Sequence, residues 1–151
     1  MRYSKTVGCD VYDTDCLFVI GGTVTEAMME LCDLIGVSGK DRAKGLEYAE
    51  TAAPCRGRFI SPPKCRSFAI YLPELPEGPL LIGTVAHECL HAVAHLMADA
   101  GVEWTVHGDE GGKWVNDEPF CYLLGFYVRE FMSFAEGVKE LQAKKSRKKR
   151  V

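Results

Sequence analysis

The chain lacks several features that would define its class at once. No run of apolar residues approaches the ~20 that a membrane-spanning helix needs, so we expect no transmembrane segment. The seven cysteines include no pair at Cys-x-x-Cys spacing, which argues against a zinc ribbon and against a thioredoxin-type redox pair. The N-terminal residues contain aspartates rather than the apolar core of a secretion signal. A reduced, cytoplasmic location is therefore expected.

What is present suits a single globular domain. The chain has 151 residues, of which 47% are hydrophobic and 26% charged, and it contains no internal repeat. Its net charge of −3 conceals a basic end, made of Lys144, Lys145, Arg147, Lys148, Lys149 and Arg150. Without these six residues, 12 basic residues face 21 acidic ones, a net charge of −9. Such an acidic body argues against nucleic acid as the main ligand.

We therefore predict one domain over residues 1–143 and a basic tail over residues 144–151. The tail is either a solvated helix end that aids solubility, or a weak contact for nucleic acid or an acidic partner.

Hydrophobic spacing predicts an α+β fold, in which a short sheet packs with three main helices. We expect strands at residues 14–20 and 67–72, and a further short helix around 41–50. The first main helix follows Thr23, which forms a capping box with Glu26. The second, central helix begins near Pro79 or Leu80 and reaches residue 100. The third begins at residue 116.

The central helix carries the residues that point to chemistry, His87-Glu88-Cys89-Leu90-His91. Histidines at positions i and i+4 lie one turn apart on one helical face, so both imidazoles can bind one Zn²⁺ ion. The adjacent Glu88 can deprotonate a water molecule at the metal. The alternative is a helix whose histidines never bind metal.

A catalytic zinc site has three protein ligands and a water molecule. The helix that starts with Asn116-Asp117-Glu118 provides a carboxylate, and we predict His87, His91 and Glu118 as the ligands, with Asp117 as a rival to Glu118. His95 is one turn beyond His91 but about 12 Å from His87 along the axis, because each residue adds 1.5 Å. It is therefore expected to be a hydrogen-bonded core or surface histidine.

These residues resemble the zincin metallopeptidases, and within them the gluzincins, whose third ligand is a glutamate on the helix after the motif helix. The chain looks most like their short, single-domain members and similar phage-encoded proteins, for which the location would be the host cytoplasm. The resemblance covers roughly residues 67–130. It implies a small zincin-like domain with the motif on the central helix, and a strand before that helix, here Phe68–Leu72, that aligns the substrate. Thermolysin-like enzymes have Asn-Glu-x-x-Ser-Asp around the third ligand, whereas this chain has an inserted Asp117 and has Tyr122 four residues after Glu118.

Several other side chains have both a functional and a structural interpretation. Tyr122 lies four residues after Glu118 and can donate a hydrogen bond to a tetrahedral intermediate, as a tyrosine or histidine does in several zincins; otherwise it is a core tyrosine. Tyr71 has the same two interpretations, a hydrogen-bond donor at the site or a core tyrosine. Cys89 is expected to pack in the core. His107 and Glu110 belong to a glycine-rich loop that either covers the site or is solvated.

The main hypothesis is a zinc-dependent peptidase that cleaves protein or peptide bonds, with Glu88 as general base. The alternative is a catalytically inactive zincin scaffold, such as a phage accessory protein that binds a partner. The presence of Glu88 favours the enzyme, because an inactive scaffold needs no general base. A nucleic-acid-directed function depends on the basic tail alone and predicts salt-dependent binding.

Overall fold

The computed structural model describes residues 1–101 and 118–148. This part of the chain forms a four-stranded sheet, four α-helices and one short 3-10 helix. In chain order the elements are β1 (Tyr3–Cys9), η1 (Asp10–Tyr12), β2 (Thr14–Ile20), α1 (Val24–Leu34), α2 (Gly39–Thr51), β3 (Arg58–Ile60), β4 (Phe68–Leu72), α3 (Pro79–Asp99) and α4 (Glu118–Lys148).

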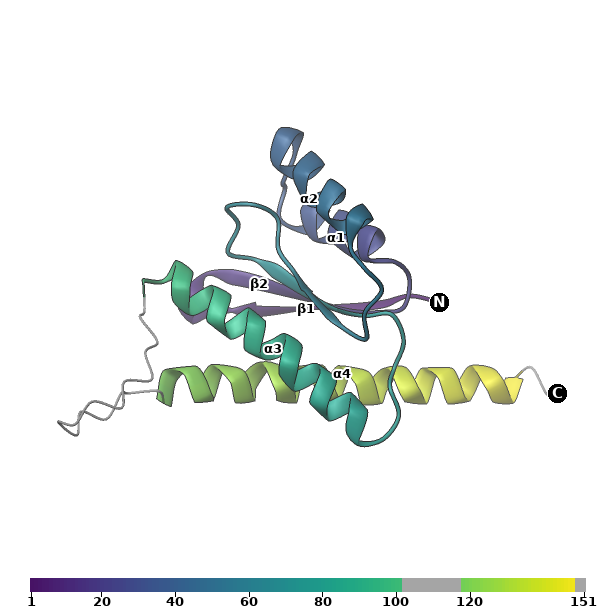
Figure 1. The fold of residues 1–151 in the computed structure, drawn as a ribbon. Coiled ribbons are helices and arrows are strands. Elements are labelled where there is room, and N and C mark those ends of the chain that lie inside the picture. The colour runs from purple at the N-terminus through teal and green to yellow at the C-terminus, as the bar shows by residue number, and fades with distance from the viewer. Residues whose placement is uncertain (102–117, 149–151) are drawn as a thin grey trace.

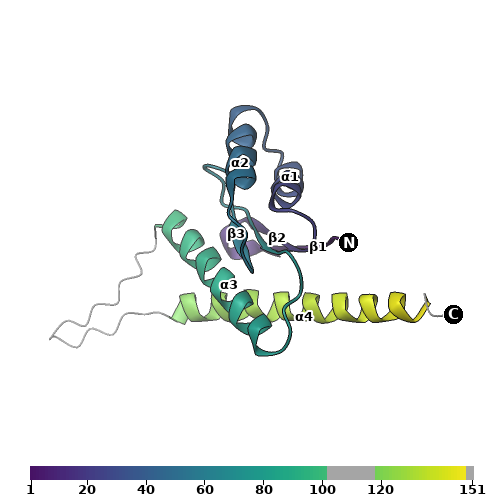
Figure 2. The same ribbon diagram turned by 45° about the vertical axis from the view of Figure 1, so that its right-hand side comes forward.

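The elements form three layers, with the sheet in the middle (Figure 1). The strand order is β1-β2-β4-β3; β2 and β4 are parallel, and the two outer strands are antiparallel to their neighbours. Helices α1 and α2 pack on one face of the sheet, and α3 and α4 on the other (Figure 2). The sheet therefore separates two hydrophobic cores.

The two central strands are buried on both faces. All five residues of β4 are buried, and β2 is nearly as well covered. Because successive side chains of a strand point to opposite faces, Phe18 and Ile70 join the core under α3 and α4, whereas Val19 and Tyr71 join the core under α1 and α2. Such burial explains why these strands contain continuous apolar runs.

The motif helix α3 contributes one apolar stripe to the larger core. Val85, Cys89, Val93 and Leu96 are buried between the sheet and α4. Among the described helices, α3 is long and apolar enough to cross a membrane by length and composition. This differs from the expectation that no segment meets that test. Its apolar stripe packs against the sheet and α4.

The α+β class and both predicted strands are confirmed, but the helix count is not. The described residues form four α-helices rather than three, because the short helix expected at 41–50 is a full element, α2. The first strand, β1, was not predicted, since only Val7 of its seven residues is buried. The alternation of apolar residues is therefore weak, and hydrogen bonding to β2 defines the strand.

The basic segment continues the last helix. The boundary predicted between residues 143 and 144 falls inside α4, which reaches Lys148, and residues 139–148 are all exposed. Lys149 and Arg150 lie outside the described residues. Contact of this segment with nucleic acid or an acidic partner stays a prediction.

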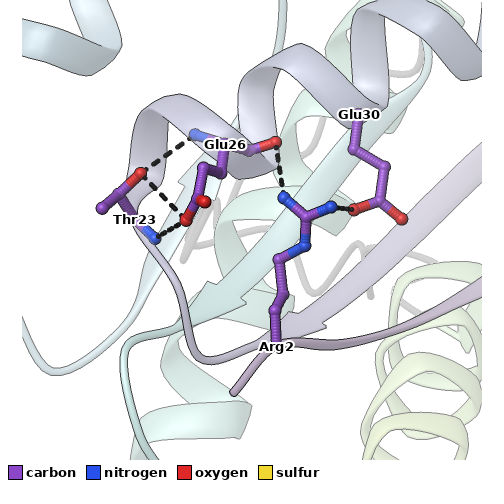
Figure 3. Close-up of polar contacts among 4 residues, drawn as sticks. All are labelled: Arg2, Thr23, Glu26 and Glu30. Carbon is purple, nitrogen blue, oxygen red and sulfur yellow. Dashed lines mark hydrogen bonds and ion pairs between the residues drawn. The ribbon is translucent and has the colours of Figure 1, made fainter.

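The start of α1 confirms the capping box. The Thr23 hydroxyl accepts a hydrogen bond from the Glu26 amide at 3.1 Å, and the Glu26 carboxylate accepts one from the Thr23 amide at 2.8 Å (Figure 3). Arg2 adds an ion pair with Glu30 at 3.2 Å, which connects the chain start to the same helix.

Replacing Thr23 with alanine is expected to lower the free energy of unfolding by about 1 kcal/mol, because the Glu26 amide loses the hydroxyl that accepts its hydrogen bond. Urea unfolding followed by circular dichroism measures this change. Thr25→Ala is the matched control, since Thr25 makes no such bond, and it should leave stability nearly unchanged. Equal losses in the two variants would contradict the capping role.

The buried thiols predict loss of stability in alkali. Burial raises the pKa of Cys16 well above its ordinary value, and burial also raises the pKa of Cys89 to about 12. Above pH ~9 these thiols ionise in the unfolded chain but stay protonated in the fold, so the unfolding free energy falls as the pH rises, by about 1.4 kcal/mol per pH unit for each thiol. In reducing buffer, the unfolding free energy of Cys16→Ala should fall less steeply between pH 9 and 11 than that of the wild type. If the unfolding free energies of the two proteins fall in parallel over this range, the assignment to Cys16 is refuted.

Candidate metal centre

The two motif histidines converge at the exposed side of α3. Their Nε2 atoms lie 3.1 Å apart, and the two rings are nearly perpendicular, at 84°. Both residues are exposed, while Cys89 between them is fully buried. The 3.6-residue period produces this division, because it turns positions 87 and 91 outward whenever position 89 packs inward.

The spacing of the two nitrogens fits a shared cation. Two nitrogens bound to a tetrahedral zinc at 2.0–2.1 Å lie about 3.3–3.4 Å apart. At this separation one imidazole Nε2–H can donate to the other Nε2, or both Nε2 lone pairs can bind one cation. Exposed neutral imidazoles are common zinc ligands. The pair therefore has the chemistry and separation of two corners of a zinc site.

Glu88 is buried and held by the sheet. Glu88 is one of two buried polar residues in the described part of the chain, and 7% of its surface is exposed. Its Oε2 atom accepts a hydrogen bond from the backbone amide of Phe59 at 2.7 Å. A carboxylate removed from water requires such a partner. The bond fixes Glu88 beside β3 and leaves Oε1 free of any described hydrogen bond.

His87 and Glu88 both line an open cavity of about 570 Å³ between α3 and the chain that leads into β3, here called the motif cavity. The cavity wall also includes Cys55, Arg56 and Gly57, together with Pro79, Leu80, Gly83 and Thr84 from α3.

Gly57 permits the close approach of that wall to the helix. A Cβ atom at this position would lie 2.7 Å from the Thr84 side chain and 3.0 Å from Cγ of Glu88. Only a residue without a side chain fits. Residues 55–57 were missed by the sequence analysis because they lie between prolines in a segment without periodicity, and the lone glycine was the only local signal.

The strand beside the motif is β3, not the strand predicted. Phe68–Leu72 was expected to be the strand that aligns a substrate, which requires a free edge, but β4 pairs with both β2 and β3 and is buried on both faces. The edge is β3, whose Phe59 amide already contacts Glu88. A three-residue strand in an irregular segment carries too little pattern for detection, whereas the apolar run of β4 is conspicuous.

The predicted third ligand is not tested by the described geometry. Glu118 is the first residue of α4, and its side chain lies outside what the structure describes. Asp117, His107 and Glu110 also fall outside the described residues. Within residues 1–101 and 119–148, no three histidine, cysteine or acidic side chains form a metal-binding group.

The remaining candidates are positioned as follows. Tyr122 is 76% exposed, so its interpretation as a core residue is wrong, and it is not among the residues that line the motif cavity. The Tyr71 hydroxyl donates to the Gly22 carbonyl at 2.8 Å in the opposite core, which makes it structural. His95 lies 3.0 Å from the Cys65 carbonyl. Because a carbonyl only accepts, the proton is on Nε2, and His95 is the hydrogen-bonded histidine that was expected.

Comparison with known proteins gives no further guidance, because no family model, no curated protein and no solved structure matches this chain.

Proposed function

We propose that this protein is a zinc-dependent peptidase whose metal ligands are His87, His91 and Glu118. One observation carries the proposal: two histidine Nε2 atoms 3.1 Å apart stand beside a buried carboxylate, and one of these histidines shares a cavity with that carboxylate. Two neutral nitrogens and one carboxylate form a ligand set used by catalytic zinc sites.

Zinc, when bound, supplies Lewis acidity, which makes water a nucleophile at neutral pH and polarises a peptide carbonyl. Glu88 then acts as the general base. Its Oε2 is oriented by the Phe59 amide, and Oε1 can take a proton from the attacking water and return it to the leaving amine. Fixing the carboxylate on the sheet reduces the entropy lost on reaching the reactive geometry.

The sheet edge offers a means of holding the substrate. In the described part of the chain β3 pairs only with β4, and on its other side Glu88 holds the Phe59 amide. An extended peptide added on that side as a further strand would therefore bond to the remaining backbone groups of β3 and its flanking residues. A peptide in that position passes next to Glu88, whose carboxylate contacts β3. We propose a narrow set of substrates for this site. Broad cleavage of unfolded casein that is abolished in Glu88→Ala would count against this narrow range.

Metal binding is the first test of the proposal. Native mass spectrometry is expected to find one zinc per chain in the wild type, and weaker or no zinc in His91→Ala and Glu118→Ala, because each removes one of three ligands. His95→Ala is the matched control on the same helix and should keep the metal, since its Nε2 is bonded to Cys65. Asp117→Ala should also keep it if Glu118 is the ligand. A wild type that takes up no added zinc would exclude the enzyme.

The second test separates chemistry from metal binding. Glu88→Gln keeps the shape of the side chain and an oxygen for the Phe59 amide but removes the base, so peptide cleavage should fall about 100-fold or more. Zinc content measured on the same sample should not change. An unaltered cleavage rate would exclude Glu88 as the base. A wild type that binds zinc and cleaves no peptide would indicate the inactive scaffold instead.

A further inference from the structure

A second pocket lies at the other end of β3 and has a different chemical character. It has a volume of about 430 Å³, and its lining includes Lys44 and Tyr48 from α2, Phe59 from β3, and Lys64 from the loop that follows. We call it the lysine pocket. His95 of α3 also lines it, which connects it to the motif helix. No aspartate or glutamate is among its lining residues.

The two lysines of the lysine pocket have no directly bonded partner. In the described part of the chain, neither the Lys44 nor the Lys64 ammonium group has a hydrogen bond or ion pair. The Tyr48 oxygen accepts a weak hydrogen bond from Arg58 at 3.4 Å, which leaves the hydroxyl proton free to donate. Two free cations and one donor at a concave surface match the needs of an oxyanion.

The backbone at Lys64 gives an independent reason to assign a role to this side chain. Its φ angle is +61°, in the left-handed region that residues with a side chain rarely adopt. Among the described residues, Asp13 is the other non-glycine residue with positive φ, and aspartate is a type that adopts this region more readily than lysine. Glycine would adopt the turn without strain, which makes Lys64 a candidate for a functional side chain.

The lysine pocket lies on the path of a peptide that adds to β3. The motif cavity includes Gly57, just before the strand, and the lysine pocket includes Phe59 and Ser61, within and just after it. Along α3, His95 is about 6 Å from His91 and about 12 Å from His87, at 1.5 Å per residue. An extended peptide covers that span in about two to four residues.

We propose that the lysine pocket binds the carboxylate of an acidic side chain in a peptide that lies along β3. This inference names a substrate class for the proposed peptidase and to that extent rests on it. Because β3 runs from the motif cavity towards the lysine pocket, an antiparallel peptide runs the other way. The acidic residue then lies two to four residues on the N-terminal side of the cleaved bond.

Peptide binding tests the pocket without any need for turnover. The full-length chain is titrated, with fluorescence anisotropy as the readout, against a labelled eight-residue peptide that carries one glutamate and against its glutamine counterpart. The glutamate peptide should bind about five-fold more tightly, and the difference should shrink at high salt. The double variant Lys44→Gln, Lys64→Gln should lose the preference.

The matched control is Lys139→Gln, Lys144→Gln, which makes the same change in net charge at the exposed end of α4. It should keep the preference for glutamate. Equal weakening in both double variants, or equal binding of the two peptides by the wild type, would overturn the proposal.

Lys64→Gly separates a binding role from a structural one. It relieves the left-handed strain and removes one cation, so affinity for the glutamate peptide should fall about two- to three-fold while Tm does not fall. A lower Tm with unchanged affinity would assign Lys64 to the fold alone and contradict the proposal.

Inorganic phosphate serves as the competing probe for the same oxyanion chemistry. At equal concentration it should not displace the glutamate peptide, which also bonds to β3. Displacement by phosphate at that concentration would mean that the pocket serves a free anion rather than a peptide.

The outcomes for the lysine pocket and for the peptidase are distinguishable. A lysine-dependent preference for glutamate in a chain that binds no zinc would leave the pocket established and the enzyme excluded. Cleavage that depends on Glu88, at sites without an acidic residue two to four positions before the bond, would leave the enzyme established and the pocket's role refuted.

Discussion

The structure depends on how α3 divides its surface between the core and solvent. Val85, Cys89, Val93 and Leu96 are buried against the sheet and α4, and burial of such side chains contributes roughly 1.5–3 kcal/mol each for the larger ones. Once that stripe is buried, the helical period determines the directions of the other side chains of α3. His87 and His91 must face outward, one turn apart, and Glu88 must face the edge of the sheet. The hydrophobic packing therefore creates the geometry of the candidate site.

The bond between Glu88 and the Phe59 amide joins this helix to a strand that has little else to hold it. β3 is three residues long and lies at an edge, and only one of its residues is fully buried. The bond satisfies a backbone donor at the open side of the strand and a buried carboxylate at once. It also explains why Gly57 is tight against Thr84 and Glu88, since helix and strand can approach only where no side chain intervenes.

This arrangement places the two pockets beside the same strand and the same helix. Both border β3 and both use α3, yet one contains the histidine and carboxylate chemistry and the other contains free lysine charges. Strand addition would bring a single extended peptide past both pockets, so that chemistry and recognition are separated by a few residues along one axis.

The local patterns in the sequence determined much of the fold. The capping box at Thr23, the runs of β2 and β4, and the limits of α3 all follow from short-range hydrogen bonding and periodicity, and all are present as predicted. The i, i+4 spacing of the two histidines likewise determined that their rings meet. The position of β3 at the sheet edge, the partner of Glu88 and the exposure of Tyr122 were decided only by the tertiary structure. They arise from contacts between segments far apart in the chain, for which no local period exists, and segment 52–65 folds as it does because α3 and β4 provide its partners.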